Sequence, residues 1–243
     1  MKIARVVKGI LGEAHDLHAD RAQMKRMKRL FTVLSSLALT STAGLALIQA
    51  GFVAQPYGDQ IVNADSSVTL PQGGVLRDNK RGYSIDATFI QYLDNDYLKA
   101  TNAKIKNNTG QFIASKSVNY DIKADRMVIA GPLEFSDANV SGVRASRAVA
   151  MLQAQKTVAF NVTASNPVFK ANTVVFDGAR KEVFLYGNYE FNSKDGKQKG
   201  SGGTATSSAV INFAVSGSPK ILSSKAIPAG VLSAYLALIA QSK

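Results

Sequence analysis

The stretch FIASKSVNYDIKADRMVIAGPLEF, residues 112–135, recurs in the chain. Residues 169–191 read FKANTVVFDGARKEVFLYGNYEF, and one gap in this second copy aligns the two. Seven positions are then identical, whereas average residue usage gives about one or two matches by chance. A repeat of this kind indicates a structural unit that has been copied. The identical pairs are Phe112/Phe169, Ala114/Ala171, Val118/Val174, Asp121/Asp177, Gly131/Gly187, Glu134/Glu190 and Phe135/Phe191.

Both copies have the pattern of a β-hairpin. The middle of each copy contains Asp, in YDIKADR and in FDGARKE, and Asp and Gly are typical turn residues. After the turn, apolar residues alternate with polar ones, which places one set on a single face of a strand. That set is Met127, Ile129, Gly131, Leu133 and Phe135 in the first copy, and Val183, Leu185, Gly187, Tyr189 and Phe191 in the second. The gap between Ala171 and Val174 predicts a bulge in one copy.

Two weaker copies, at 84–105 and 143–160, extend the repeat. They give about four hairpin units between residues 84 and 191, without helix-length periodicity. A single hairpin is unstable alone, so the units must stack to bury one continuous apolar face. We therefore expect an all-β fold: an antiparallel β-jellyroll or half-open sandwich of repeated hairpin units.

An uncharged stretch precedes the repeats. Residues 30–54, LFTVLSSLALTSTAGLALIQAGFVA, contain no ionisable side chain. As a helix they would reach about 37 Å, against about 30 Å for the hydrocarbon core of a bilayer. The basic cluster KRMKR at 25–29 lies directly before them, and the positive-inside rule places that side in the cytoplasm. The sequence predicts a single-pass inner-membrane protein with the bulk of the chain in the periplasm.

A cleaved signal peptide is the alternative to a retained anchor. A cleavage site with two small residues separated by one position should follow the apolar core. Ala54 and Ala50 do not provide one, because the residues two positions before them are the large Phe52 and Ile48. We therefore expect the mature protein to keep residues 1–29 and a reporter fused after Lys243 to be periplasmic. A mature N-terminus between residues 45 and 60 would instead identify a signal peptide.

The predicted organisation has six parts: a cytoplasmic basic tail (1–29), the transmembrane anchor (30–54), a linker (55–74) with one short strand at 67–70, the periplasmic β-domain (75–191), a flexible linker (192–208), and a C-terminal strand plus short helix (209–243). Pro228 suits the start of that helix. The apolar run 226–240 would reach about 22 Å, which is short for a span. We expect this helix to pack on the β-domain or to lie at a membrane surface.

No enzyme chemistry is predicted. The chain has no Cys and two His, both of which lie in the predicted cytoplasmic tail, so a Ser-His-Asp triad or a Cys nucleophile in the β-domain is excluded. Phosphate-binding, dinucleotide-binding and zinc-protease motifs are absent from the sequence. His15, Asp16, His18 and Asp20 are interpreted as a solvated tail, so neither a metal nor a cofactor is expected. The net charge of +12 comes without a nucleic-acid-binding motif, so no nucleic acid is expected as a partner.

The carboxylates of the β region have structural interpretations. Most are predicted to form turns: Asp94, Asp96, Asp121, Asp125 and Asp177. Glu134 and Glu190 recur with the repeat and are predicted to point outward from strands. A glycosidase-like pair of carboxylates is the alternative left open for these two.

The order of these features resembles the LptC family. The resemblance rests on the anchor with its basic flank, followed by YSIDA at 83–87, ASKSVNYD at 114–121 and VFLYGN at 183–188. It covers about residues 25–191. The family implies a half-open β-jellyroll that binds the acyl chains of lipopolysaccharide. It also implies two protein partners: the inner-membrane ABC transporter that delivers the lipid, and a periplasmic bridge protein that receives it through strand pairing. The longer cytoplasmic tail and the residues beyond Phe191 depart from the family pattern.

If the resemblance holds, the apolar stripe lines a lipid slot. The predicted lipid-binding residues are Phe112, Val118, Tyr120, Met127, Ile129, Leu133, Phe135, Val183, Leu185, Tyr189 and Phe191. Small residues would leave the slot under-filled: Ala114, Ala130, Gly131, Ala171 and Gly187. The alternative is a membrane-anchored structural or assembly protein whose core is filled and whose β-domain binds only protein partners. A continuous apolar cavity open at both ends favours the first function, and a packed interior favours the second.

Overall fold

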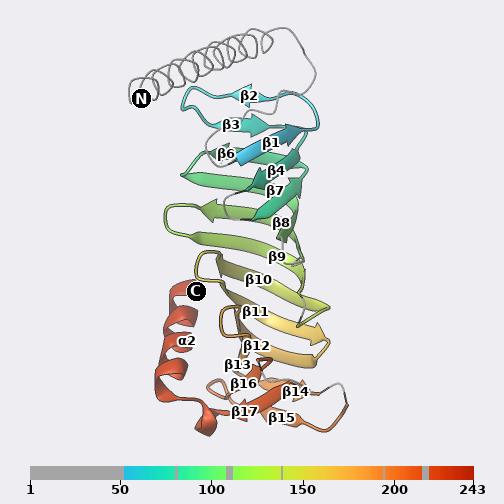
Figure 1. The fold of residues 1–243 in the computed structure, drawn as a ribbon, viewed down its shortest axis with the longest axis vertical. Coiled ribbons are helices and arrows are strands. Elements are labelled where there is room, and N and C mark those ends of the chain that lie inside the picture. The colour runs from blue at the N-terminus through green and yellow to red at the C-terminus, as the bar shows by residue number, and fades with distance from the viewer. Residues whose placement is uncertain (1–51, 80–81, 108–111, 138, 194, 215–218) are drawn as a thin grey trace, which may run out of the picture. The chain divides into compact units, whose positions relative to one another are not determined.

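The computed structural model describes residues 52–79, 82–107, 112–137, 139–193, 195–214 and 219–243. These residues form seventeen β-strands and a C-terminal α-helix (Figure 1). Every strand pair is antiparallel. The predicted all-β antiparallel fold is therefore confirmed.

The strands are β1 (Phe52–Pro56), β2 (Ile61–Val62), β3 (Val68–Leu70), β4 (Gly74–Asp78), β5 (Tyr83–Ala87), β6 (Phe89–Leu93), β7 (Tyr97–Asn107), β8 (Phe112–Asp121), β9 (Arg126–Ser136), β10 (Val143–Met151), β11 (Lys156–Ser165), β12 (Val168–Asp177), β13 (Glu182–Tyr186), β14 (Tyr189–Asn192), β15 (Lys199–Gly202), β16 (Ser208–Asn212) and β17 (Lys220–Ser223). A short 3-10 turn, η2 (Ser224–Ala226), leads into the helix α2 (Ala229–Ser242).

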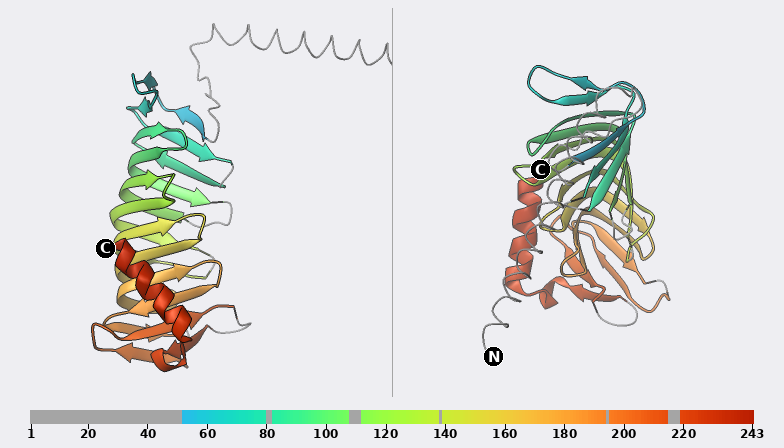
Figure 2. Two further views of the ribbon diagram at one scale, coloured as in Figure 1. Left: turned by 90° about the vertical axis from the view of Figure 1, so that its left-hand side faces the viewer. Right: turned by 45° about the horizontal axis from the view of Figure 1, so that its top comes forward.

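The sheet folds along one corner into two facing layers. The first residues of β7 pair with β6, whereas Lys104–Asn107 at its end pair with β5. The same change occurs in β12, which pairs first with β14 and then with β13. Layer 1 therefore contains β1, β4, β5, β14, β15 and one half of each of β7–β12. Layer 2 contains the other halves with β2, β3, β6, β13, β16 and β17. Figure 2 shows the strands stacked, with the colour running from blue to red along the stack.

Residues with unusual backbone requirements mark the corner. Asn102 and Asn161 have φ of 49° and 52°, and Gly187 has φ of 66°, a left-handed conformation that Asn and Gly tolerate best. At Gly131 a Cβ atom would collide with the backbone carbonyl of Ser146 on β10. The repeated pair Gly131/Gly187 thus lies where the chain crosses between the layers. The backbone geometry of the corner therefore accounts for its recurrence.

The turns of the repeated hairpins fall where they were expected, but the second strand of the second copy is divided into β13 and β14. Asp121 ends β8 and Asp177 ends β12, each at a turn into the next strand. The strand pairing of β8 with β9 shifts register between Ala114 and Ser117, which confirms the predicted irregularity at that point. The weaker copies are also hairpins, β6–β7 and β10–β11.

One apolar interior fills the space between the layers. Aromatic rings join the two layers along the stack: Phe52 with Tyr92 at 5.7 Å between ring centroids, Tyr83 with Tyr120 at 6.4 Å, and Phe135 with Phe176 at 5.1 Å. The inward residues of both layers belong to a single cluster that runs from β1 to β16. This continuity is what the stacked-repeat interpretation requires, because no hairpin buries its apolar face alone.

Helix α2 covers the outer face of layer 2. Its Tyr235 and Ile239 pack on outward residues of four strands, together with Ile227 just before the helix. Those strand residues are Val158, Val175, Phe184 and Val210. The strands beneath α2 are therefore buried on both faces, and Figure 1 shows the helix beside the stack. Of the two predicted locations for this helix, packing on the β-domain is confirmed.

Strands extend beyond the predicted limits of the β-domain. Residues 52–54, assigned to the end of the anchor, belong to β1, where Phe52 and Ala54 are buried. This corrects the C-terminal limit of the predicted span; residues 30–51 lie outside the described residues and would still reach about 33 Å as a helix. Within the part of the chain that the structure describes, no helix has the length and hydrophobicity needed to cross a membrane.

The segments predicted as linkers also contain strands. Strands β2 and β3 lie within 55–74, and the strand expected at 67–70 is confirmed as β3. Strand β15 lies within 192–208 and pairs with β14. Its sequence, KGSG, lacks apolar alternation because main-chain hydrogen bonds, not buried side chains, hold it in place. The strand expected from AVINFAV is present as β16.

Candidate functional site

The predicted lipid-binding residues gather in the interior between the two layers. Ten of the eleven belong to the single apolar cluster, and all ten are less than 8% exposed. For Phe112 only the backbone is described, and it lies on β8. The ten are Val118, Tyr120, Met127, Ile129, Leu133, Phe135, Val183, Leu185, Tyr189 and Phe191.

Each repeated hairpin supplies residues to both layers. Met127 and Ile129 come from the layer 2 half of β9, and Leu133 and Phe135 come from its layer 1 half. All four face inward because the strand turns the corner at Gly131 without losing its alternation. The same arrangement holds for β13 and β14 around Gly187. The alternation predicted this shared face, although it did not predict that the face is folded over.

The interior is packed rather than hollow. An apolar cavity beside Phe135 and Phe176 has a volume of about 10 Å³, the space of roughly one water molecule. The cavity is lined by Ile113, Ile129, Leu133, Phe135, Val143, Ala148, Thr157, Ala159 and Phe176. The predicted lipid-binding side chains that the structure describes are therefore closely packed.

A surface pocket lies next to this cavity. It has a volume of about 480 Å³, where β9, β10 and β11 meet in layer 1. Its lining residues are Glu134, Phe135, Ser136, Gly142, Val143, Arg144, Thr163, Ala164 and Ser165. Phe135 and Val143 line both spaces, so the surface pocket adjoins the interior at these two apolar side chains. The sequence prediction omitted Val143, although it begins the weak copy at 143–160.

The mouth of this pocket is charged. The Arg144 Nε atom lies 3.2 Å from the Glu134 Oε1 atom on the neighbouring strand, and both side chains are exposed. Glu190 is likewise paired, with Lys170 at 3.0 Å. Both glutamates point outward from their strands, as predicted.

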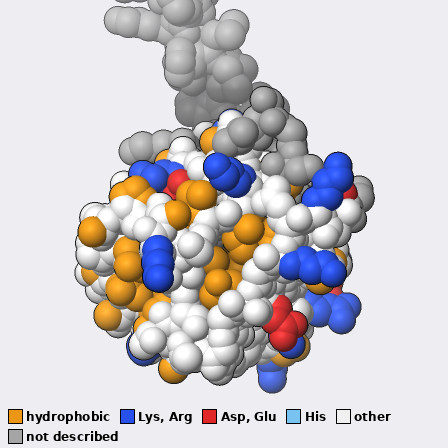
Figure 3. Space-filling model, turned by 90° about the horizontal axis from the view of Figure 1, so that it is seen from below, with side chains coloured by type: hydrophobic (Ala, Val, Ile, Leu, Met, Phe, Trp, Pro, Cys, Tyr) orange, Lys and Arg blue, Asp and Glu red, His pale blue; other side chains and the backbone are white. Residues whose placement is uncertain are grey.

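The apolar interior reaches the surface at the end formed by β15 and β17. Phe213 and Ile221 are partly buried against the interior there, and the Ile221 N–H donates to the Gln198 Oε1 atom at 3.0 Å. This hydrogen bond brings β17 of layer 2 close to layer 1. Figure 3 shows hydrophobic side chains in the middle of this face, with Lys and Arg side chains around them.

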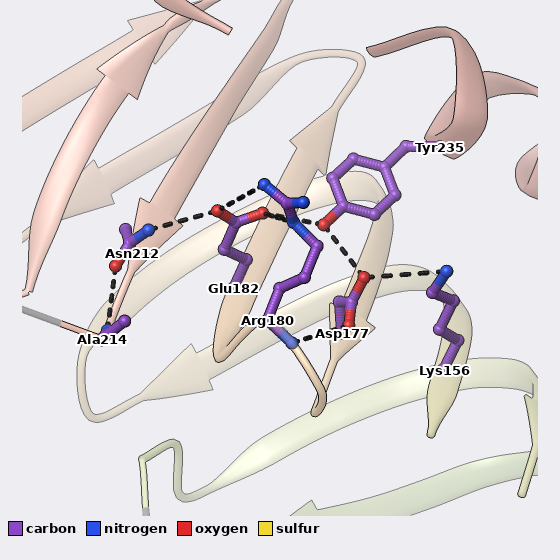
Figure 4. Close-up of polar contacts among 7 residues, drawn as sticks. All are labelled: Lys156, Asp177, Arg180, Glu182, Asn212, Ala214 and Tyr235. Atoms are coloured by element: carbon purple, nitrogen blue, oxygen red, sulfur yellow. Dashed lines mark hydrogen bonds and ion pairs between the residues drawn. The ribbon is translucent and has the colours of Figure 1, made fainter. Parts of the chain in front are cut away.

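A buried polar cluster lies on the other side of layer 2, under α2 (Figure 4). The Tyr235 hydroxyl lies 2.9 Å from Glu182 Oε2 and 3.2 Å from Asp177 Oδ2. Arg180 donates to both Glu182 oxygens at 2.8 and 3.3 Å, and Asn212 donates to Oε1 at 3.1 Å. The side chains of Asp177 and Glu182 are 1% and 8% exposed. Tyr235 thus ties the helix to two buried carboxylates.

The electrostatics of this cluster favour a structural role. Burial opposes ionisation of Glu182, but hydrogen bonds from Arg180, Tyr235 and Asn212 outweigh it and lower its pKa. Burial, with the hydrogen bond to Glu182, raises the pKa of Tyr235. The cluster therefore combines an ionised carboxylate with a neutral phenol and does not provide an acid and a base poised near neutral pH.

Three of the predicted turn carboxylates accept hydrogen bonds from backbone N–H groups. Asp121 accepts from Ala124 at 2.9 Å, Asp125 accepts from Gln153 at 2.9 Å, and Asp177 accepts from Arg180 at 3.0 Å through its second oxygen. The turn role of Asp177 was predicted, but its contact with Tyr235 was not. No group of three or more His, Cys, Asp or Glu side chains able to hold a metal ion occurs in the described ranges.

The fold and site define a class: an all-β protein of two facing antiparallel layers, sandwich-like, around a continuous apolar interior. No known family model matches the chain, and no curated protein matches it significantly.

Proposed function

We propose that this chain is a membrane-anchored periplasmic carrier of lipopolysaccharide or a similar acylated glycolipid, with a half-open β-jellyroll as in the LptC family that it resembles. The observation that supports this most directly is the position of Phe135 and Val143. These two side chains line both the surface pocket and the small cavity in the apolar interior, and that interior continues through the whole stack. In this proposal, acyl chains enter there.

Entry requires the two layers to part near Phe135 and Phe176, because the present cavity is far too small for an acyl chain. The gain would come from removing lipid surface from water, at about 25 cal/mol per Å² of apolar area. Ordering of the chains and displacement of core contacts oppose it. At the mouth, Arg144 supplies a cation for the anionic head group.

The remaining features fit a relay between two partners. The uncharged residues 30–51 would anchor the chain beside an inner-membrane ABC transporter. Strands β15 and β17 are each paired on one side only among the described residues. An edge strand of this kind accepts a strand from another protein, such as a periplasmic bridge protein.

Site-specific photocrosslinking tests the carrier function. A small diazirine-bearing amino acid at Val143, in the full-length chain with purified lipopolysaccharide, should form a lipid adduct. Val158 is the matched control, because it is equally buried but faces α2 on the outer side of layer 2. Adduct formation at neither position, or equally at both, would contradict entry of lipid past Val143.

The packed interior favours a second function, a membrane-anchored structural or assembly protein whose β-domain binds only protein partners. In that case the diazirine at Val143 yields no lipid adduct. A diazirine on β15 or β17 would instead crosslink to a protein, and the core would never open.

A further inference from the structure

Helix α2 has an uncharged side, mostly of small residues, that faces away from the sheet. While Tyr235 and Ile239 pack on layer 2, the exposed positions recur at intervals of three and four residues on the opposite side. They are Ala229, Gly230, Ser233, Ala234, Leu236, Ala237, Ala240 and Gln241. Leu236 is 36% exposed. The helix contains no charged residue at all.

This composition is unusual for the surface of a protein in water. A surface helix normally carries charged residues on its solvent side, whereas the solvent side of α2 consists of alanine and glycine together with Ser233, Leu236 and Gln241. The fourteen residues of α2 reach about 21 Å, which is too short to cross a bilayer of about 30 Å. The outward side therefore fits an apolar medium that it enters only shallowly.

The charges around the helix identify that medium. Lys225 stands just before α2 and Lys243 just after it, and both are exposed. At the C-terminal end of α2, the Arg147 guanidinium donates to the Lys243 carbonyl oxygen at 3.3 Å. From residue 196 to residue 243 the sequence contains five lysines and no acidic residue. An apolar strip with cations at both ends matches the interface of an anionic bilayer.

We propose that α2 lies along an anionic lipid surface, with its outward side at the level of the head groups. This contact is peripheral and separate from the apolar interior, so it stands whether or not the interior carries lipid. Small side chains along most of the strip allow the helix axis to approach the lipid closely, and Leu236 supplies its largest apolar side chain. The buried cluster of Tyr235, Asp177 and Glu182 holds the helix in this orientation.

A single tryptophan tests the proposal, because the chain has none of its own. Ala237→Trp is made in the full-length chain and measured with lipid nanodiscs of phosphatidylcholine alone or with phosphatidylglycerol. In the anionic discs its emission should move to shorter wavelength and be quenched by lipids brominated near the head group. Ser201→Trp, exposed on β15 of layer 1, is the control and should not respond. Ala240→Trp repeats the measurement on the same side of the helix.

The lysines provide a second readout. Each lysine near an anionic surface is worth about a fivefold change in the docking equilibrium, so Lys225→Gln and Lys243→Gln should each weaken it about fivefold, and added salt should act in the same direction. An unchanged tryptophan spectrum on anionic discs for both reporters overturns the proposal. So does a spectral shift that appears without lipid and follows protein concentration, because the outward side would then be covered by a second copy of the chain. Neither result depends on the lipid adduct at Val143.

Discussion

At the scale of single residues, the Tyr235 hydroxyl is the clearest link between distant parts of the chain. It reaches Asp177 and Glu182, which lie 58 and 53 residues earlier. A phenol has one proton to donate, so the two carboxylates share it while Arg180 and Lys156 provide the other favourable contacts. Removing the hydroxyl would leave buried carboxylate oxygens short of a donor.

We expect Tyr235→Phe to lower the free energy of unfolding by about 1–3 kcal/mol, the cost of leaving a buried polar group unsatisfied. Urea denaturation of the full-length chain measures this. Tyr57→Phe is the control, since the Tyr57 hydroxyl also donates to a carboxylate, that of Asp86 at 2.9 Å, but is on the surface. The control should change stability by less than about 0.5 kcal/mol. Equal losses in both variants would show that the buried cluster has no special role.

Gly131 is a second residue whose identity is fixed by its surroundings, because they leave no room for a Cβ atom. A Cβ atom would meet the Ser146 backbone, which cannot move aside as a flexible side chain could. Gly131→Ala should therefore cost about 1–3 kcal/mol, the range for overpacking. Gly203→Ala is the matched control because no atom lies within 4 Å of its Cβ position. Thermal melts that shift equally for the two variants would contradict the close approach at the corner.

At the scale of elements, α2 is held by apolar contacts and by one polar cluster that depends on pH. The pKa of Glu182 is lowered in the folded chain, so this residue stabilises the fold above its unfolded pKa of about 4.3. That contribution is lost as the pH falls through the lower folded value. Acid should thus loosen the attachment of the helix before the interior is affected.

The expected result is a stability that falls between about pH 5 and pH 3 more steeply in the wild-type chain than in Glu182→Gln. Because other carboxylates titrate in the same range, the difference in slope between the two proteins is the quantity to measure, by urea denaturation at each pH. Amide exchange in α2 should accelerate in the same range for the wild-type chain. Parallel slopes would mean that Glu182 does not couple the helix to pH.

At the scale of the whole described unit, two layers share one core, and the proposed carrier function and its alternative differ in how that core responds to change. Leu185 is fully buried in the interior on β13. In a packed core, a shorter polar side chain there leaves both a cavity and an unpaired hydroxyl. A partly open slot already contains space and water, so it would tolerate the change.

Since the structure shows a packed interior, we expect Leu185→Ser to lower the free energy of unfolding by about 2–5 kcal/mol. Leu236→Ser, on the exposed side of α2, should change it by less than about 0.5 kcal/mol. Chemical denaturation compares the two. A small loss for Leu185→Ser, together with weaker capture of lipopolysaccharide, would instead indicate an interior that opens readily in solution.

The sequence by itself determined the hairpins, their Asp turns and the inward face of each strand. These features are local: alternation fixes which side chains share a face, and a turn carboxylate bonds to its own backbone a few residues away. It also placed β3, β16 and the helix after Pro228, whose signals lie within a few consecutive residues.

Only the tertiary structure decided how those strands divide between layers. A strand that crosses a corner keeps its alternation, so Met127 and Phe135 look alike in sequence although they line opposite layers. β15 has no side-chain pattern because backbone pairing alone defines it. The cluster of Tyr235 with Asp177 and Glu182 joins residues that come together only when α2 packs on layer 2. Contacts between such distant residues arise from packing, which no local pattern records.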